Sequence, residues 1–189
     1  MAISLDLDDT LWPIAPVMLR AEEARSDWLA GPAPLTSALI QDEARRLSLR
    51  QQILREQPQI GHDLGALRRE LIRQALQQHE EDTALASPAY EVFIAERMRV
   101  NLFDDAGPAL DWLAQHFPLI AVSNGNADVH QVGLGRYFKS ALSAQDFGIG
   151  KPDARIFHAA ALSIGVMPQA VLHVGDDADP SLVAFARLA

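Results

Sequence analysis

The sequence predicts an α/β protein with a parallel sheet that is interrupted by a long helical segment. Short apolar runs at residues 2–5, 118–122 and 171–174 have the length and composition of strands, and each ends abruptly in polar residues. Helical patterns separate the later runs, as in the βαβ units of parallel sheets. Between the first two runs, residues 14–104 show helical spacing and no convincing strand pattern.

The first apolar run is followed directly by an acidic stretch. Residues 2–5 alternate as a strand does, and three carboxylates, Asp6, Asp8 and Asp9, follow with Thr10. Carboxylates this close repel one another unless a cation or protons offset their charge. Ligands of open parallel sheets bind beyond the carboxyl ends of the strands, so this stretch is a candidate site. An acidic turn after an edge strand, or a weak calcium loop, is the alternative interpretation.

The segment that follows is expected to form a bundle of about four helices. Proline and glycine near residues 31–34 break the first pattern, and Asp63 is the expected N-cap of the third and most regular helix. The four expected helices cover approximately residues 16–29, 34–57, 64–76 and 87–102.

The same patterns predict two domains. We expect an α/β core made of residues 1–13 and 105–189, with residues 14–104 inserted into it as a helical domain. The remaining core elements are expected to be a helix at 108–116, the strand at 118–122, a short helix after Asn126, a short strand at 141–144, a helix at 154–164, the strand at 171–174 and a final helix opened by Pro180.

Polar residues suited to a phosphate and a divalent cation follow each predicted parallel strand. Ser123 and Asn124 follow the second strand, Lys151 lies in a glycine-containing loop, and Asp176 and Asp177 follow the last strand. Because parallel strands share a direction, these residues are expected to meet Asp6 and Asp8 at one edge of the sheet. Asp6 and Asp176 provide the hard oxygen ligands that Mg²⁺ prefers.

These residues carry a resemblance to a known family. The DxDxT start, the strand ending in Ser123, the Lys151-Pro152 loop and the Gly-Asp-Asp ending occur in the order typical of haloacid dehalogenase-like phosphohydrolases. The sequence is identified as a member of that superfamily, which implies a Rossmann-like core with an inserted helical cap. Three stretches resemble one branch of this superfamily most: DLDDTLWPIAPVMLRAE, EQPQIGHD and PLIAVSNGNADVHQVGLGRYF. That branch contains flavin mononucleotide hydrolases and 5-amino-6-(5-phospho-D-ribitylamino)uracil phosphatases.

The resemblance implies a Mg²⁺-dependent phosphomonoesterase acting on a small phosphorylated metabolite. Asp6 would be the nucleophile and a metal ligand, forming an aspartyl-phosphate. Asp8 would protonate the leaving group and then activate water, while its backbone carbonyl ligates the metal. Ser123 and the amide of Asn124 would bind phosphoryl oxygens, Lys151 would offset the negative charge of the reacting groups, and Asp176 would complete the metal site.

The amino-acid composition argues against several classes of binding partner and of chemistry. The net charge of −9 argues against a nucleic-acid or anionic-membrane surface, and the absence of cysteine rules out thiol chemistry and disulfides. The longest apolar runs are too short to span a bilayer, and the acidic N-terminus is unlike a signal peptide. We therefore expect a cytoplasmic monomer or homodimer that binds a small-molecule substrate.

The C-terminal region departs from the family pattern. Ser181 stands where the family carries a second acid, and relatives usually continue with a further strand and helix. A catalytically weakened phosphate- or partner-binding protein is therefore an alternative, as is a phosphotransferase or mutase that uses the same residues. Dehalogenase activity ranks lower, because a departing halide needs no acid such as Asp8.

Several other side chains have two interpretations each. Asp9 and Thr10 are expected to stabilise the turn, and His62 and His173 to be structural. Trp12 either stacks on a flat substrate ring or packs inside the protein, with no preference. The arginines of the third expected helix are interpreted as a solvated face, with substrate contact as the alternative: Arg68, Arg69 and Arg73.

Overall fold

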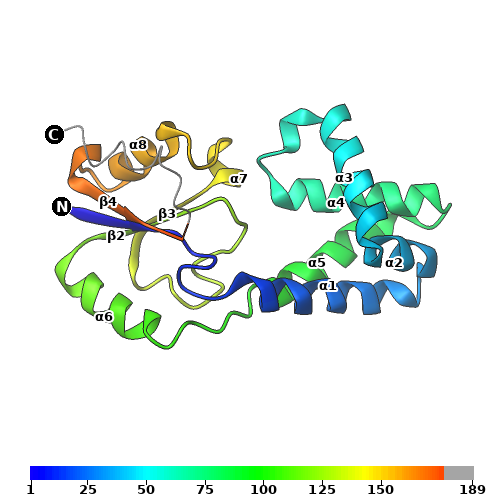
Figure 1. Ribbon diagram of the computed structural model, residues 1–189, viewed down its shortest axis with the longest axis horizontal. Coiled ribbons are helices and arrows are strands. Elements are labelled where there is room, and N and C mark those ends of the chain that lie inside the picture. The colour runs from blue at the N-terminus through cyan, green and yellow to red at the C-terminus, as the bar shows by residue number, and fades with distance from the viewer. Residues whose placement is uncertain (177–189) are drawn as a thin grey trace. The chain divides into compact units, whose positions relative to one another are not determined.

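The computed structural model describes residues 1–176 and divides them into two compact units. One unit comprises residues 1–14 together with the described chain from residue 100, and the other comprises residues 15–99. Figure 1 shows that the first unit holds the strands, while the second is built of helices. The chain thus leaves the sheet after its first strand, forms the helical unit and then returns.

Among the described residues, the sheet of the first unit has four parallel strands in the order β3-β2-β1-β4, which confirms the predicted fold class. Leu5 of β1 pairs with Ala121 of β2 on one side and with Val174 of β4 on the other. β1 is therefore an interior strand, and the edge-strand interpretation is wrong. The strands are β1 (Ala2–Leu5), β2 (Leu119–Ser123), β3 (Phe138–Ser143) and β4 (Val171–Val174).

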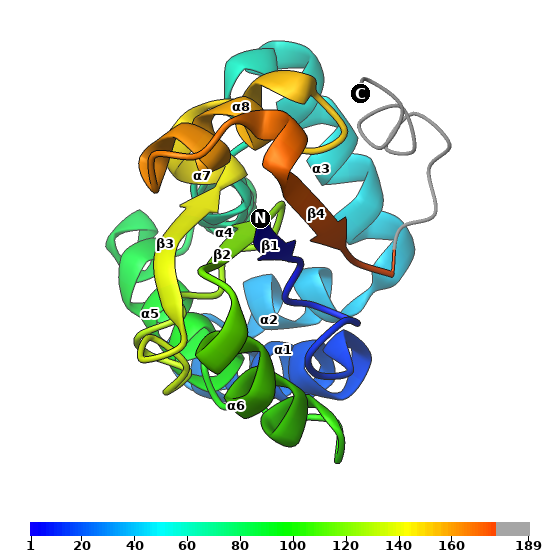
Figure 2. The same ribbon diagram turned by 90° about the vertical axis from the view of Figure 1, so that its left-hand side faces the viewer.

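Helices cover both faces of this sheet. Figures 1 and 2 place α6 (Ala106–His116) on one face and α8 (Ala154–Ser163) on the other. Ile120 and Val122 of β2 pack on Ile156 of α8, and both strand residues are fully buried. Burial on both faces explains why β2 is a continuous apolar run rather than an alternating one. The short helix α7 (Ala144–Phe147) follows β3 directly.

The helical unit is held together by a separate apolar core. Its most deeply buried side chains include Ile40, Ile53, Ile72 and Phe93, which come from four different helices. Three short 3-10 segments complete the described chain: η1 (Pro58–Ile60) and η2 (Thr83–Leu85) here, and η3 (Pro168–Ala170) before β4. The helices of this region are α1 (Ile14–Ala30), α2 (Pro34–Gln41), α3 (Glu43–Glu56), α4 (Leu64–Gln78) and α5 (Ala86–Arg97).

The structure differs from the expected elements in four places. The helix expected at 34–57 is two helices, because Asp42 is extended and its carboxylate caps α3 by accepting from the Arg45 N–H. The helix expected after Asn126 is a series of turns, and β3 starts at Phe138 rather than residue 141. The helix expected at 87–102 shortens to Ala86–Arg97. The helix expected after Pro180 lies outside the described residues.

The arginines of α4 are not the solvated face that the sequence suggested. Arg68 donates to Glu22 at 2.9 Å and lies over the ring of Phe93, 3.7 Å from its centroid. The guanidinium of Arg69 lies 4.7 Å from the ring centroid of Tyr90. These contacts join α4 to α1 and α5, so Arg68 and Arg69 act in the packing of the helical unit.

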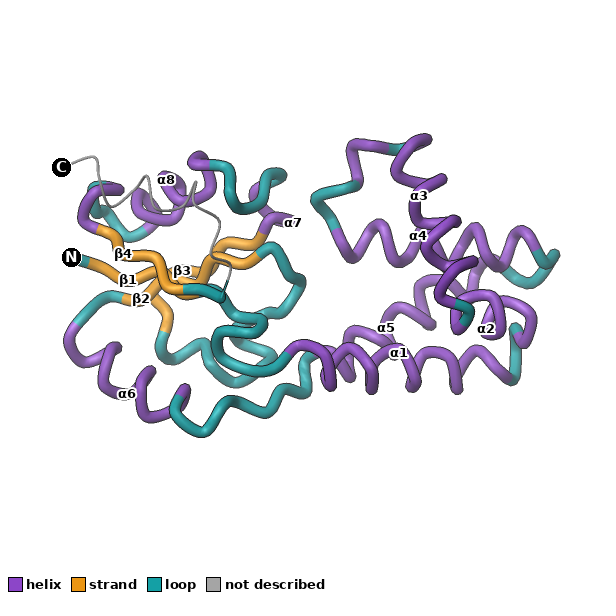
Figure 3. Tube along the Cα trace, in the orientation of Figure 1, coloured by secondary structure: helices purple, strands orange, loops and turns teal. Residues whose placement is uncertain are grey.

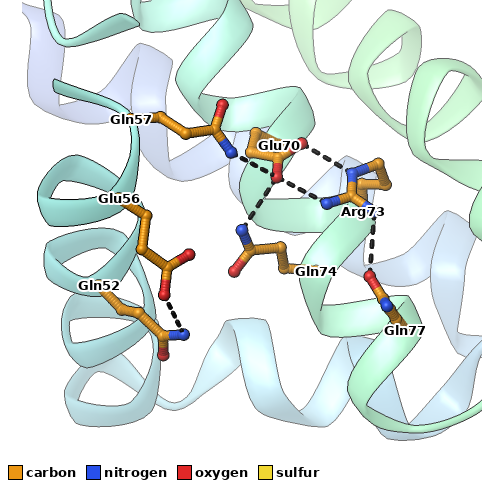
Figure 4. Close-up of polar contacts among 7 residues, drawn as sticks. All are labelled: Gln52, Glu56, Gln57, Glu70, Arg73, Gln74 and Gln77. Atoms are coloured by element: carbon orange, nitrogen blue, oxygen red, sulfur yellow. Dashed lines mark hydrogen bonds and ion pairs between the residues drawn. The ribbon is translucent and has the colours of Figure 1, made fainter. Parts of the chain in front are cut away.

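Arg73 takes part in a polar network centred on Glu70, drawn in Figure 4. Its Nε and one terminal nitrogen each donate to the Glu70 carboxylate at 2.7 Å. This bidentate bond, with further donors from Gln74 and Gln57, lowers the pKa of Glu70 to about 2 although partial burial opposes the shift. Gln57 comes from the end of α3, so the network also fastens α3 to α4.

Ionised Glu70 contributes to the free energy of unfolding, and we expect this contribution to depend on pH. The folded-state pKa lies below the usual value of 4.5, so this contribution is fully present above pH 4.5 and is lost as the pH falls toward 2. Glu70→Gln should cost about 0.5–1 kcal/mol of unfolding free energy near pH 7, with the difference from the parent protein vanishing near pH 2. Urea unfolding at a series of pH values measures this difference.

Glu56→Gln is the matched control, because Glu56 is exposed and accepts a hydrogen bond from Gln52 at 2.9 Å (Figure 4). If the loss of unfolding free energy in Glu70→Gln were the same at pH 7 and pH 2, the stabilising role of the Glu70 charge would be contradicted.

Candidate active site

The loops that follow the strands line an open cavity of about 430 Å³ in the first unit. Figure 3 shows these loops gathered at the same end of the sheet. β1 and β4 are neighbours although they lie far apart in sequence, so the cavity forms where the strand order reverses. All six residues singled out from the sequence line it, together with Asp9 and Gly125: Asp6, Asp8, Ser123, Asn124, Lys151 and Asp176.

Asp6 directly follows β1 and is held at both carboxylate oxygens. Oδ1 accepts a hydrogen bond of 2.8 Å from the N–H of Leu7, and Oδ2 forms an ion pair with Nζ of Lys151. The side chains of Asp6 and Lys151 are only 12% and 6% exposed, so water screens their attraction weakly. The N–H of Asp6 also donates to Val174 O at 2.9 Å, which ties the position of Asp6 to β4.

Lys151 is positioned by the side chain of Asn124. The Asn124 Oδ1 accepts from the Lys151 N–H at 2.7 Å, and its Nδ2 donates to the Lys151 carbonyl at 2.8 Å. A Cβ on Gly150 would lie 2.4 Å from that Oδ1, so a glycine is required for the approach. The family resemblance implied a contact between the amide of Asn124 and phosphate. No sequence pattern predicted that the Asn124 side chain would hold the loop that carries Lys151.

Ser123 ends β2 and is almost completely buried. Its hydroxyl oxygen accepts a hydrogen bond of 3.0 Å from the N–H of Gly125. As the acceptor of that bond, the hydroxyl keeps its own proton for donation, which suits contact with an anionic oxygen. The hydroxyl lines the same cavity as Asp6 and Lys151.

The turn after β1 separates the three neighbouring acids. Asp9 adopts a left-handed conformation with φ of 55°, and its Oδ1 accepts from the N–H of Ile14 at the start of α1. This contact is the loop-capping bond expected of Asp9. Trp12 is fully buried, and its indole N–H donates to Oδ1 of Asp8 at 2.9 Å. Trp12 therefore packs inside the first unit, and the stacking alternative is not supported.

Asp176 is connected to the acidic turn through Thr10, whose hydroxyl oxygen accepts from the Asp176 N–H at 3.1 Å. This bond joins residues 166 positions apart, and it gives Thr10 a role that no local pattern reveals. A Cβ on Gly175 would lie 3.2 Å from the Cβ of Asp6, so the last strand ends close against the first. Asp177 and Ser181, both singled out from the sequence, lie outside the described residues.

His62 and His173 do not form a ligand set. His173 of β4 forms a hydrogen bond of 2.8 Å with the hydroxyl of Ser4, and its ring packs in a T-shaped arrangement with that of Phe157, with ring centroids 4.9 Å apart. Burial, followed by the positive charge of Lys151, lowers the pKa of His173 to about 4. His173 is therefore neutral near pH 7. His62 lies in the helical unit and is exposed.

The charge of the cavity favours a cation. Four of its lining residues are acids and one is a lysine, so a phosphate dianion would be repelled without a further positive charge. Within residues 1–176, no three His, Cys, Asp or Glu side chains form a metal-binding cluster. Mg²⁺ is typically bound by one or two carboxylates and retained waters rather than by a full protein cage. The donors around Asp6 and Asp176 therefore fit this ion.

A parallel sheet with helices on both faces, and with an acidic cavity where its strand order reverses, defines an α/β enzyme with its reactive groups on strand-end loops. The chain belongs to the haloacid dehalogenase-like hydrolases, because the model of that family matches residues 1–187.

Curated relatives include phosphatases. The 5-amino-6-(5-phospho-D-ribitylamino)uracil phosphatase YigB of Escherichia coli (strain K12) is 34% identical over 180 residues, covering 93% of this chain and 75% of the relative. A phosphoserine phosphatase of Thermus thermophilus is 32% identical over 131 residues, covering 66% of this chain and 52% of that protein. Family and relatives together support a phosphatase.

A solved structure described as a 2-haloacid dehalogenase from Pseudomonas syringae pv. Tomato DC3000 is also similar. It is 40% identical, with a TM-score of 0.88, covering 94% of this chain and 79% of that one. A phosphatase of the same superfamily from Thermococcus onnurineus shares the fold, at 22% identity and a TM-score of 0.59, covering 93% of this chain and 77% of that one.

Among residues 1–176, no helix is both long enough and apolar enough to cross a membrane.

Proposed function

We propose that this protein is a Mg²⁺-dependent phosphomonoester hydrolase that acts on a small phosphorylated metabolite through an aspartyl-phosphate. The observation that carries the proposal is the buried Asp6–Lys151 ion pair, which shares one cavity with Asp8, Ser123 and Asp176. A carboxylate fixed by hydrogen bonding and partly shielded from water is suited to nucleophilic attack. Asp8, two residues further on, supplies an acid–base group in the same cavity.

The proposed reaction has two displacements. In the first, a carboxylate oxygen of Asp6 bonds to phosphorus while the bond from phosphorus to the leaving oxygen breaks, and Asp8 protonates that oxygen. In the second, Asp8 takes a proton from water, the water oxygen bonds to phosphorus, and the acyl-phosphate bond to Asp6 breaks. Inorganic phosphate leaves, and both aspartates return to their starting states. Lys151 and Ser123 bind the phosphoryl oxygens throughout.

Mg²⁺ would be held by the carboxylates of Asp6 and Asp176 and by the carbonyl of Asp8. When bound, it neutralises phosphate charge and favours attack by an anionic nucleophile. The contact between the Asp176 N–H and Thr10 supports this assignment, because it keeps the two ligand-bearing loops together.

Removal of divalent cations is expected to stop turnover. Phosphate release in excess chelator should fall by a factor of about 10³ or more, because the acidic cavity then repels the phosphate dianion. Added Mg²⁺ should restore the activity, which a malachite-green assay measures. Full activity in chelator would exclude the proposed metal dependence.

A 2-haloacid dehalogenase is the competing function, favoured by the likeness to the Pseudomonas syringae structure. It would use Asp6 to displace halide from carbon, a step that requires no proton donor. The presence of Asp8 in the cavity supports the phosphatase, since a leaving alkoxide needs a proton donor and a leaving halide does not.

The test is a substrate screen with and without Mg²⁺. It should include flavin mononucleotide, 5-amino-6-(5-phospho-D-ribitylamino)uracil, phosphoserine, sugar phosphates and 2-chloropropionate. Flavin mononucleotide and the ribitylamino-uracil phosphate are the first candidates, because the likeness to YigB extends over most of the chain. Phosphate release supports the proposal, and chloride release without it supports the dehalogenase. Phosphate appearing on an acceptor alcohol indicates a phosphotransferase, and binding without turnover indicates the weakened alternative.

A further inference from the structure

The indole of Trp12 is coupled to the carboxylate of Asp8. Trp12 is fully buried, and its Nε1–H donates to Oδ1 of Asp8 at 2.9 Å. A buried indole N–H requires an acceptor, because leaving one unpaired loses the hydrogen bonds it made to water. Asp8 is only partly buried and lines the cavity, so this bond connects the protein interior with the candidate site.

The turn between Asp8 and Trp12 fixes the positions of these two residues relative to each other. Asp9 is left-handed with φ of 55°, and its N–H donates to the carbonyl of Trp12 at 2.8 Å, so residue 12 returns beside residue 8. The carbonyl of Leu11 accepts a hydrogen bond of 3.0 Å from the N–H of Phe103. Phe103 lies where the chain returns to the first unit, so this bond holds the turn against that segment. The ring of Trp12 therefore occupies a fixed position, as a positioning group requires.

The direction of the bond also selects one carboxylate oxygen. An indole N–H can only donate, so Oδ1 of Asp8 must accept. When Asp8 carries a proton, the better position for it is Oδ2, because protonated carboxyl oxygens are poor acceptors. The bond thus sets both the orientation of the side chain and the oxygen from which a proton is delivered.

We propose that Trp12 is a positioning residue for the proton transfer by Asp8. This inference rests on the proposed function. As the bond between phosphorus and the leaving oxygen breaks and the bond to Asp6 forms, the proton on Oδ2 of Asp8 passes to the leaving oxygen. Trp12 makes no contact with the reacting atoms in this scheme; its indole keeps Oδ1 in place so that Oδ2 meets the leaving group.

Leaving groups of different basicity distinguish this role from a merely structural one. We compare kcat/KM for glycerol 2-phosphate, whose alkoxide needs a proton, with kcat/KM for p-nitrophenyl phosphate, whose phenolate leaves readily without one. Trp12→Phe should lower the first about ten-fold or more and the second by less than about two-fold. In an Asp8→Asn background, Trp12→Phe should cause no further selective loss. Equal losses for both substrates, or no loss, would overturn the proposal.

Two controls separate the lost N–H from the lost volume. Benzothienylalanine at position 12 keeps the bicyclic shape but lacks the donor, and it should show the same selectivity as Trp12→Phe even where phenylalanine disturbs packing. Trp112→Phe is the matched substitution at an exposed tryptophan of α6, and it should leave both substrates unaffected.

A measurement without turnover tests the contact itself. The indole Nε1–H resonance of Trp12, assigned from its loss in Trp12→Phe, should move upfield in Asp8→Ala as the hydrogen bond is removed. An unmoved resonance would overturn the proposal whether or not the protein is active. If the parent protein hydrolysed no phosphomonoester, the proposed function would fail, and this resonance would still show whether Trp12 holds Asp8.

Discussion

Asp6→Asn is expected to lower phosphate release by a factor of about 10³ or more, because an amide oxygen is a poor nucleophile toward phosphorus. Asparagine has nearly the same volume, and its Oδ1 still accepts from the Leu7 N–H that holds Asp6 at 2.8 Å. The substitution thus removes the charge, the reactive oxygen and the ion pair with Lys151 while keeping the hydrogen bond from Leu7. Steady-state phosphate release with saturating Mg²⁺ measures the effect, and circular dichroism checks the fold.

Asp63→Asn is the matched control for this substitution. Asp63 caps α4 by accepting from the Ala66 N–H at 2.8 Å, and asparagine caps helices about as well as aspartate. Activity should therefore be unchanged. Substantial turnover by Asp6→Asn with its fold intact would exclude Asp6 as the nucleophile, and with it the aspartyl-phosphate.

Lys151→Met should reduce kcat/KM by a factor of about 10²–10³, since the ammonium group offsets the charge of both nucleophile and phosphate. Methionine keeps much of the apolar stem, whose side chain is only 6% exposed. The loss of the ion pair leaves Asp6 without its cation, which we expect to cost about 1–3 kcal/mol of unfolding free energy. That cost stays below the range for fully buried pairs because Asp6 borders a cavity that admits water.

The sequence contains one further lysine, Lys139, which supplies the control. Lys139 is exposed on β3, so Lys139→Met should change neither kcat/KM nor the urea-unfolding free energy by more than about 0.5 kcal/mol. Equal effects of the two substitutions would mean that overall charge matters rather than the Asp6–Lys151 pair.

Local patterns predicted much of the fold. Short apolar runs identified β1, β2 and β4, and the run in β2 is continuous because that strand is buried on both faces. The pattern failed where one residue interrupts a helix: Asp42 separates α2 from α3 although the apolar spacing continues across it. It also failed for Arg68, whose charge suggested solvent but whose guanidinium lies over Phe93. Burial of an arginine depends on partners from other helices, which periodicity does not reveal.

The sequence by itself determined the kinds of group available: an acidic stretch after the first strand, a hydroxyl and amide after the second, one lysine in a glycine-containing loop and an acid after the last strand. It also determined that they share an edge, because parallel strands run in one direction.

Only the tertiary structure decided which groups touch. Asp6 contacts Lys151, Asn124 holds the Lys151 backbone, Thr10 receives the Asp176 N–H, and Trp12 donates to Asp8. Three of these four contacts join residues distant in the chain. They depend on the strand order, on the approach that Gly150 and Gly175 permit, and on the turn that Asp9 forms, and residue spacing fixes none of these.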